Sequence, residues 1–168
     1  SSQLSAVMHA PAFQQLEQSW SGLHYLVSNS STGTRLQIRL FNATKRELVK
    51  DFQAALEFDQ SSMFKKVYEE EFGTFGGAPF AALLGDFSIT RQPEDIYFVE
   101  QMSHVAAAAH APFIASAAPE LFGLETYGDL GKPRDLSKVF DTVEYAKWKA
   151  FRESEDARFV NLVMPRTL

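Results

Sequence analysis

The chain has 168 residues, with 16 Lys and Arg against 21 Asp and Glu, so its formal net charge is −5. This acidic balance argues against a nucleic-acid clamp or a binder of anionic membranes, because both need a basic face. The chain has no cysteine, which excludes disulfides, thiolate metal sites and cysteine nucleophiles from it and fits a reducing cytoplasm. No apolar run approaches the roughly 18 residues that would span a membrane.

Composition and ends predict one domain cut from a longer protein. Hydrophobic residues make up 45% of the chain, which is typical of a single globular domain. The chain opens without a methionine and stops just after a strand-like run. We therefore expect residues 1–168 to be a single α/β domain, a fragment of a longer subunit, with residues 1–10 as a flexible lead-in.

The first half of the chain carries one helix and one alternating segment before its best-defined helix start. Apolar residues recur at helical spacing from Pro11 to Val27, which predicts an N-terminal helix. Arg35 to Leu40 alternates charged or polar with apolar residues, which predicts a half-buried strand near a sheet edge. Thr44 with Glu47 then forms a capping box. A further helix is expected from about Ser62 to Gly73.

The second half alternates strands and helices. Ala81–Phe87 reads as a central strand, Pro93–Ala109 as a helix that begins with proline and two acids, and Phe113–Ala117 as a second strand. Asp141 is expected to cap another helix, and Arg158–Met164 to close as a strand. The order predicts an α/β fold: a mostly parallel sheet of about four strands with helices on both faces, plus the N-terminal helix.

A glycine-rich turn and one acid are the candidates for ligand chemistry. Gly73–Gly77 lacks the lysine of a phosphate loop and follows a helix, so a structural turn with positive φ or close backbone approach is favoured. Asp86 lies near a strand end, where α/β sheets place ligand groups, but has no second acid beside it. An enzyme or ligand-binding domain with a site near Asp86 and Gly73–Gly77 stays open as an alternative.

Histidine and serine patterns give no catalytic or metal constellation. His104 and His110 are six residues apart, so they lie on different faces of a helix and cannot share a metal as an i, i+4 pair would. No G-x-S-x-G motif frames a serine nucleophile. We expect no catalysis, no cofactor and no metal.

Two charged clusters are the candidate subunit interfaces. Three consecutive acids end a helix, where the helix dipole favours cations, so a basic partner could explain them. A second cluster interleaves both signs before the last strand and is expected to form an ion-pair network at an assembly seam. Their residues are Glu69, Glu70 and Glu71, and Arg152, Glu153, Glu155, Asp156 and Arg158.

Four stretches together resemble one protein family. They are Phe58–Gly77 (FDQSSMFKKVYEEEFGTFGG), Val105–Ile114 (VAAAAHAPFI), Pro133–Leu136 (PRDL) and Glu144–Arg158 (EYAKWKAFRESEDAR). In order and over most of the chain, they are similar to the large sheath subunit of bacterial type VI secretion systems, the TssC/VipB family. Ala78 departs from the acidic residue that this family usually has after the two glycines.

The resemblance implies a structural protein of the cytoplasm, represented here by a fragment from its N-terminal half. Large subunits of this family pair with a small sheath subunit of the TssB/VipA type, and the pairs stack into a helical tube around an inner tube and spike. Contraction drives the spike outward, and an AAA+ unfoldase of the ClpV type recycles the sheath. No nucleic acid and no membrane insertion are implied. A sheath protein of another contractile machine, such as a phage tail, stays open as a further alternative.

Overall fold

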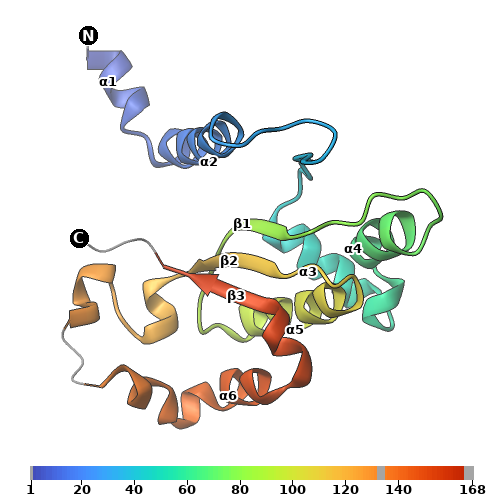
Figure 1. The fold of residues 1–168 in the computed structure, drawn as a ribbon. Coiled ribbons are helices and arrows are strands. Elements are labelled where there is room, and N and C mark those ends of the chain that lie inside the picture. The colour runs from blue at the N-terminus through green and yellow to red at the C-terminus, as the bar shows by residue number, and fades with distance from the viewer. Residues whose placement is uncertain (1, 132–134, 165–168) are drawn as a thin grey trace. The chain divides into compact units, whose positions relative to one another are not determined.

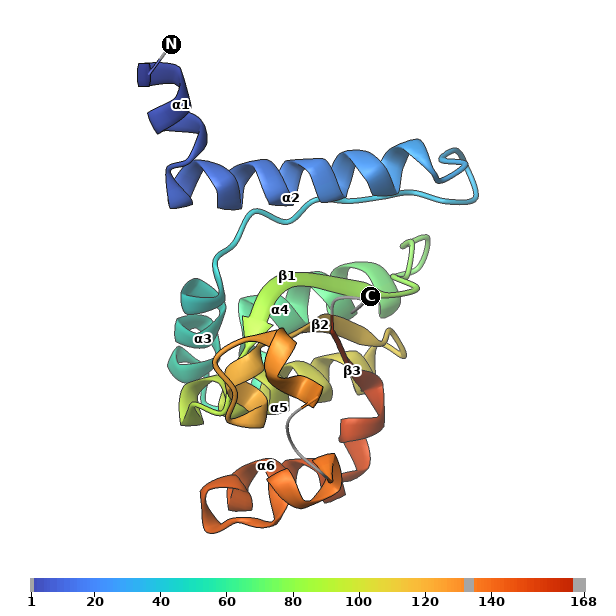
Figure 2. The same ribbon diagram turned by 90° about the vertical axis from the view of Figure 1, so that its left-hand side faces the viewer.

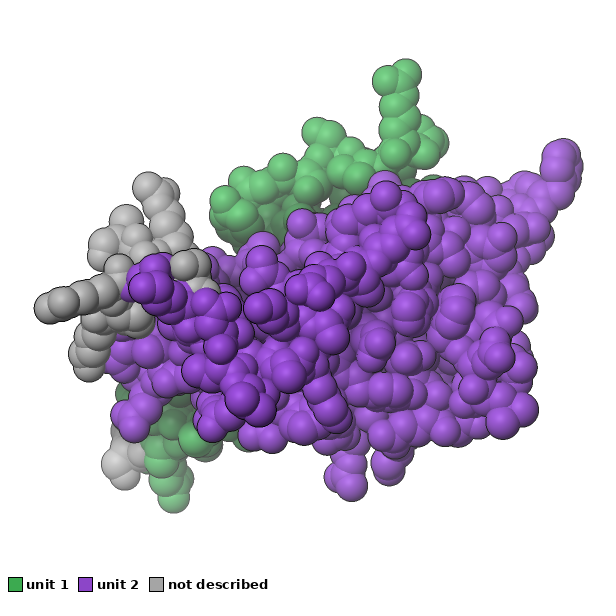
Figure 3. Space-filling view, turned by 90° about the horizontal axis from the view of Figure 1, so that it is seen from below, with its two compact units in different colours: residues 1–42 green, residues 43–168 purple. Residues whose placement is uncertain are grey.

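The computed structural model describes residues 2–131 and 135–164, so Pro133 and Arg134 of the PRDL stretch lie outside the described residues. Its contacts separate the chain into two compact units, residues 1–42 and residues 43–168 (Figure 3). Compact units defined by contacts do not test whether the chain folds as one domain, so the single domain stays a prediction.

The first unit contains two helices and an extended segment. Helix α1 (Ser2–Met8) lies within the expected lead-in, and α2 (Pro11–Ser28) has proline at its start, as the sequence predicts. None of the residues of α2 is buried. The apolar stripe that predicts this helix is therefore exposed, including Leu16 and Trp20.

The strand predicted over Arg35–Leu40 is wrong, because the structure has no strand there. Leu36 is 46% exposed and Leu40 is 68% exposed, so the alternating leucines do not rest on a core. Alternation only gives a segment an apolar face, whereas a strand also needs a partner to form its hydrogen bonds. No described segment supplies that partner.

The second unit contains a three-stranded parallel sheet in the order β1-β2-β3 (Figure 1). Its strands are β1 (Leu83–Ile89), β2 (Phe113–Ala117) and β3 (Val160–Val163). The α/β class and the parallel pairing are confirmed, but the described part of the chain has three strands in place of about four. β1 lies at an edge, so its prediction as a central strand is wrong; β2 holds the centre.

Four helices of the second unit match the predicted helical segments. They are α3 (Lys45–Ala54), α4 (Ser62–Phe64), which continues as the π-helix η2 (Lys65–Phe72), α5 (Pro93–Ala108) and α6 (Ala146–Glu153). Six short 3₁₀ turns complete the described elements: η1 (Phe58–Gln60), η3 (Pro119–Phe122), η4 (Tyr127–Gly131), η5 (Leu136–Asp141), η6 (Val143–Tyr145) and η7 (Glu155–Phe159).

Side-chain caps explain where α3 and α4 begin. The Thr44 hydroxyl accepts from the Glu47 amide, and the Glu47 carboxylate accepts from the Thr44 amide at 2.8 Å, so the predicted capping box is present. The amide and the hydroxyl of Thr44 together hold the pKa of Glu47 below its ordinary value. Asp51 accepts from the amides of Ser62 and Met63 at 3.0 Å each. Burial raises the pKa of Asp51, but these hydrogen bonds outweigh it and leave the pKa lowered.

The cap predicted at Asp141 is wrong. Asp141 ends the 3₁₀ turn η5, and α6 starts only at Ala146, after a second turn. The N-cap residue of α6 is Tyr145, whose side chain makes no capping bond. Val143, just before this helix, is 92% exposed. Trp148 and Phe151 of α6 are buried.

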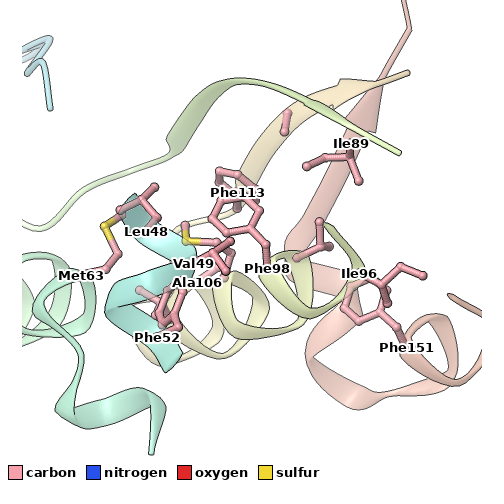
Figure 4. Close-up of a cluster of buried hydrophobic side chains, with 14 of the residues drawn as sticks. Leu48, Val49, Phe52, Met63, Ile89, Ile96, Phe98, Ala106, Phe113 and Phe151 are labelled. Atoms are coloured by element: carbon pink, nitrogen blue, oxygen red, sulfur yellow. The ribbon is translucent and has the colours of Figure 1, made fainter. Parts of the chain in front are cut away.

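Helix α5 forms the centre of the core. Phe98 is fully buried, and its ring centroid lies 6.5 Å from Phe52, 5.8 Å from Phe87 and 6.0 Å from Phe113 (Figure 4). These partners come from α3, β1 and β2, so one phenyl ring joins three elements. Ala106, in the predicted alanine tract, is also fully buried.

The sheet buries one face against these helices. Phe113, Ala115 and Ala117 of β2 are buried, and Phe87 of β1 packs on the same core. The opposite face is exposed on β1 and β3 and half-buried on β2, at Leu84, Asp86, Ser88, Ile114, Ser116, Asn161 and Val163. Within the described ranges 43–131 and 135–164 the helices flank the buried face of the sheet, and cover of the second face stays a prediction. Figures 1 and 2 show α5 and α6 on the same side of the sheet.

A buried acid ties two helices to the end of β1. Asp95, in the first turn of α5, is 5% exposed and accepts from the amide and the hydroxyl of Thr90 at 2.8 and 2.7 Å. Its other oxygen lies 2.6 Å from the ammonium of Lys45 in α3. Lys45 also donates to the carbonyl of Ser88 in β1 at 3.0 Å. The position of α3 and α5 against the strand thus depends on one carboxylate.

We predict that Asp95→Ala lowers the free energy of unfolding by about 3 kcal/mol, because it leaves the Lys45 ammonium and the Thr90 amide without their acceptor. Urea denaturation of the 168-residue chain measures the change. Glu94→Ala, an exposed acid in the same helical turn, is the matched control. Equal losses in the two variants would contradict the role given to Asp95.

Candidate interaction surfaces

The acidic cluster at the end of η2 divides into two parts. Glu69 and Glu70 are exposed, and no described cation pairs with either. Glu71 is half-buried, and its carboxylate accepts from the amide of Ala78 at 2.9 Å. Glu71 therefore holds the following turn, which leaves Glu69 and Glu70 as the outward charges.

The glycine turn after η2 is structural, as the sequence predicts. Gly76 has φ +82°, and a Cβ on Gly77 would lie 2.2 Å from the carbonyl oxygen of Glu71. The Thr74 hydroxyl donates to the carbonyl of Glu69 at 2.5 Å, and the Gly77 amide donates to the carbonyl of Thr74 at 3.0 Å. Between these fixed points the side chain of Phe75 is fully exposed.

The second charged cluster pairs partly outside itself. Asp156 lies 2.8 Å from Nδ1 of His104 in α5, while Arg158 lies 3.5 Å from Glu155. The guanidinium carbon of Arg152 lies 5.7 Å from the centroid of the Phe140 ring, and that of Arg158 lies 5.3 Å from the centroid of the Phe159 ring. The predicted self-neutralising network is thus replaced in part by a contact with α5. His104 and Asp156 are 52 positions apart, so no local pattern in the sequence could indicate this pair.

A ladder of aromatic rings connects the two clusters. Phe58, Phe64, Tyr68 and Phe72 stack in sequence with centroid distances of 4.9–5.5 Å. From Phe72 the ladder continues through His110, at 5.7 Å, to Phe159, at 6.3 Å. The acidic end of η2 and the start of β3 are therefore parts of one packed surface. The sequence marks the phenylalanines but not their order.

A groove lies between α6, η7 and β3. Its volume is about 360 Å³, and it is lined by Trp148, Phe151, Arg152, Ser154, Ala157, Arg158, Val160 and Leu162. Trp148 is 7% exposed, and its Nε1 donor has no hydrogen-bond partner among the described residues. Most of the lining is apolar, with two arginines. Of the candidate interface residues predicted from the sequence, Arg152 and Arg158 line this groove.

Asp86 and Gly73–Gly77, the residues of the alternative ligand site, do not come together at a strand end as the sequence predicts. Asp86 is exposed in the middle of β1, whereas Gly73–Gly77 precedes the amino end of that strand. The described residues contain no group of three metal-ligating side chains. His104 faces Asp156, and His110 packs edge-on against Phe72 and at a tilt against Phe159. Among the described helices, none is both long and apolar enough to cross a membrane.

The whole chain, residues 1–168, matches the family model described as VipB: EvpB/VC_A0108, tail sheath N-terminal domain. The chain belongs to this family. It is also 47% identical over 168 residues to the type VI secretion system sheath protein TssC1 of Pseudomonas aeruginosa. That alignment covers 99% of this chain and 34% of the Pseudomonas protein. The sheath domain thus spans about a third of the length of this relative. Membership of a sheath family favours the structural expectation over the enzyme alternative.

We predict that Gly77→Ala in the sheath domain lowers the free energy of unfolding by about 1–3 kcal/mol, because the new methyl group would overlap the Glu71 backbone. Thermal or urea denaturation measures this loss. Gly33→Ala is the control, since nothing lies within 4 Å of its added Cβ. A Gly77→Ala variant as stable as the control would contradict the tight return of the turn onto η2.

Proposed function

We propose that this chain is the N-terminal part of the large subunit of a type VI secretion contractile sheath. Paired with a small sheath subunit, the large subunit assembles in the cytoplasm into a helical tube. Contraction of the tube propels the inner tube and the spike. The observation that carries this proposal is the 47% identity with a type VI sheath protein along the entire chain.

The fold supports a mechanical role for residues 43–168. Phe98 joins three elements, Asp95 joins two helices to β1, and the aromatic ladder joins η2 to η7. A close-packed block of this kind resists internal deformation. Contraction then moves the block as a body, and the energy resides in contacts between subunits that have two stable arrangements.

The partners follow from the same proposal. Further copies of the subunit and the small subunit contact its surface, the inner tube lies inside the sheath, and a ClpV-type unfoldase disassembles the contracted state. The residues that we propose for subunit contacts are Glu69, Glu70, Glu71, Arg152, Glu153, Glu155, Asp156 and Arg158. No catalysis, cofactor or metal is part of the proposal.

A phage tail or another contractile particle is the second candidate, because the family model is described as a tail sheath. The printed name of the Pseudomonas relative favours the secretion system. Small and large sheath genes beside those of a secretion baseplate would separate the two candidates.

We predict that the full-length subunit, co-expressed with its small sheath partner, forms hollow tubules visible by negative-stain electron microscopy. The reason is that each pair repeats the same contacts along the tube. The full-length subunit expressed alone is the control and forms no tubules.

Two results would contradict the proposed function. One is a folded, soluble pair of subunits that never assembles. The other is turnover of nucleotide or ester substrates by the purified protein that is lost on Asp86→Ala, which would favour the enzyme alternative.

A further inference from the structure

Two features of residues 43–168 are left without a role: the fully exposed Phe75 and the groove beside β3. Both are apolar surfaces exposed to water. Covering an exposed phenyl ring or an apolar groove lowers the free energy of the system. Each is also bordered by charge. Glu69 and Glu70 precede Phe75, whereas Arg152 and Arg158 line the groove.

The tip that carries Phe75 is rigid before it meets a partner. Thr74 and Gly77 are hydrogen-bonded on either side of it, and Gly77 packs against the backbone of Glu71. A side chain presented by a fixed turn loses little conformational entropy on binding. This is the property of an interface anchor, and aromatic anchors that fill a partner's pocket contribute most to binding.

The groove has the chemistry that would receive such a tip. Its volume of about 360 Å³ exceeds the roughly 150 Å³ of an apolar cavity that binds benzene. Its lining is mostly apolar, so a phenyl ring that enters it is removed from water against Phe151, Val160 and Leu162. Arg152 lies over the Phe140 ring and has no ion pair with a described acid, whereas Arg158 is paired with the exposed Glu155 at 3.5 Å.

We propose that the Phe75 tip of one copy of this chain inserts into the α6–β3 groove of a second copy. Glu69 and Glu70 of the first copy then face Arg152 and Arg158 of the second. The inference rests on the proposed function, because it assigns one of the repeated contacts of the sheath.

Charge complementarity selects a second copy of this chain as the occupant. The outward acids have no described cation, Arg152 has no described acid, and Arg158 has one exposed ion pair, with Glu155 at 3.5 Å. The same chain thus carries both halves of a complementary pair, and the full exposure of Phe75 means that it does not fill its own groove. A contact between two different patches of identical subunits either closes into a ring or repeats as an open helix, and the helical case fits the proposed tube.

Cysteine pairing tests the contact directly, because residues 1–168 contain no cysteine. Full-length Phe75→Cys and full-length Ser154→Cys subunits, any cysteines outside this segment replaced, are mixed with the small subunit and assembled. A short bismaleimide should then join the two variants across copies. Leu56→Cys mixed with Ser154→Cys is the control, since Leu56 is 90% exposed but lies outside the proposed contact.

Charge exchange tests the same contact through assembly. Arg152→Glu with Arg158→Glu should raise the subunit concentration needed for tubules about tenfold or more, the cost of losing roughly 1.4 kcal/mol at each contact. Adding Glu69→Arg and Glu70→Arg should restore the wild-type concentration. Restoration is a result that general misfolding cannot produce.

The outcomes separate the contact from the function. Tubules that form without crosslinking above the control, or a charge exchange that fails to restore assembly, overturn the contact and leave the sheath proposal standing. Protection of Ser154→Cys from maleimide in the unassembled full-length subunit also overturns it, because the groove is then filled by the same chain. If wild-type subunits form no tubules at all, the proposed function fails and the contact fails with it.

Discussion

The burial of α5 beneath the parallel sheet is the constraint on which the rest of residues 43–168 depends. Strands that follow one another in a parallel sheet need crossovers, and right-handed crossovers between successive neighbours place their helices on one side. Phe98 fills the resulting layer from the middle of α5, and Asp95 fixes the start of that helix against β1 through Thr90 and Lys45. This construction leaves β1 and β3 as the edge strands, and their outer face is exposed in the described ranges 43–131 and 135–164.

Exposed strand edges and an exposed sheet face are expected of a protein whose surfaces are covered by other subunits, as the proposed function requires. The aromatic ladder passes from Phe58 in η1 to Phe159 in η7, and Phe58 also lies 5.2 Å from His104 of α5, so packed rings connect η1, η2 and η7 with the central helix. Close packing makes such a block stiff, and switching is then confined to contacts between blocks. The exposed apolar residues of α2 extend this logic to the first unit, whose stripe also needs cover.

Local signals in the sequence predicted local structure well. The capping box at Thr44, the proline start of α5 and the short apolar strand β2 each depend on neighbours a few residues away, so a single sequence contains them. The strand predicted at Arg35–Leu40 is wrong because alternation does not supply a pairing strand. The helix cap predicted at Asp141 is wrong because 3₁₀ turns take the place of the first turns of the helix.

The candidate surfaces were predictable only as sets of residues. The sequence marked both charged clusters, but it could not show that Asp156 faces His104 or that Glu71 closes its own turn, since those contacts depend on the tertiary fold. The groove at Trp148 and the exposed tip at Phe75 had no sequence signal that separates them from ordinary core aromatics. The family was recognisable because long matching runs carry more information than any short motif.

The stiffness of this block is the central claim, and hydrogen–deuterium exchange of the full-length sheath in its extended and contracted states tests it most directly. Exchange reports the free energy of local opening at each amide. The account predicts equal protection of α5 and β1–β3 in both states, with changes confined to surface segments such as η2 and η7. A loss or gain of protection within α5 or β2 on contraction would contradict it.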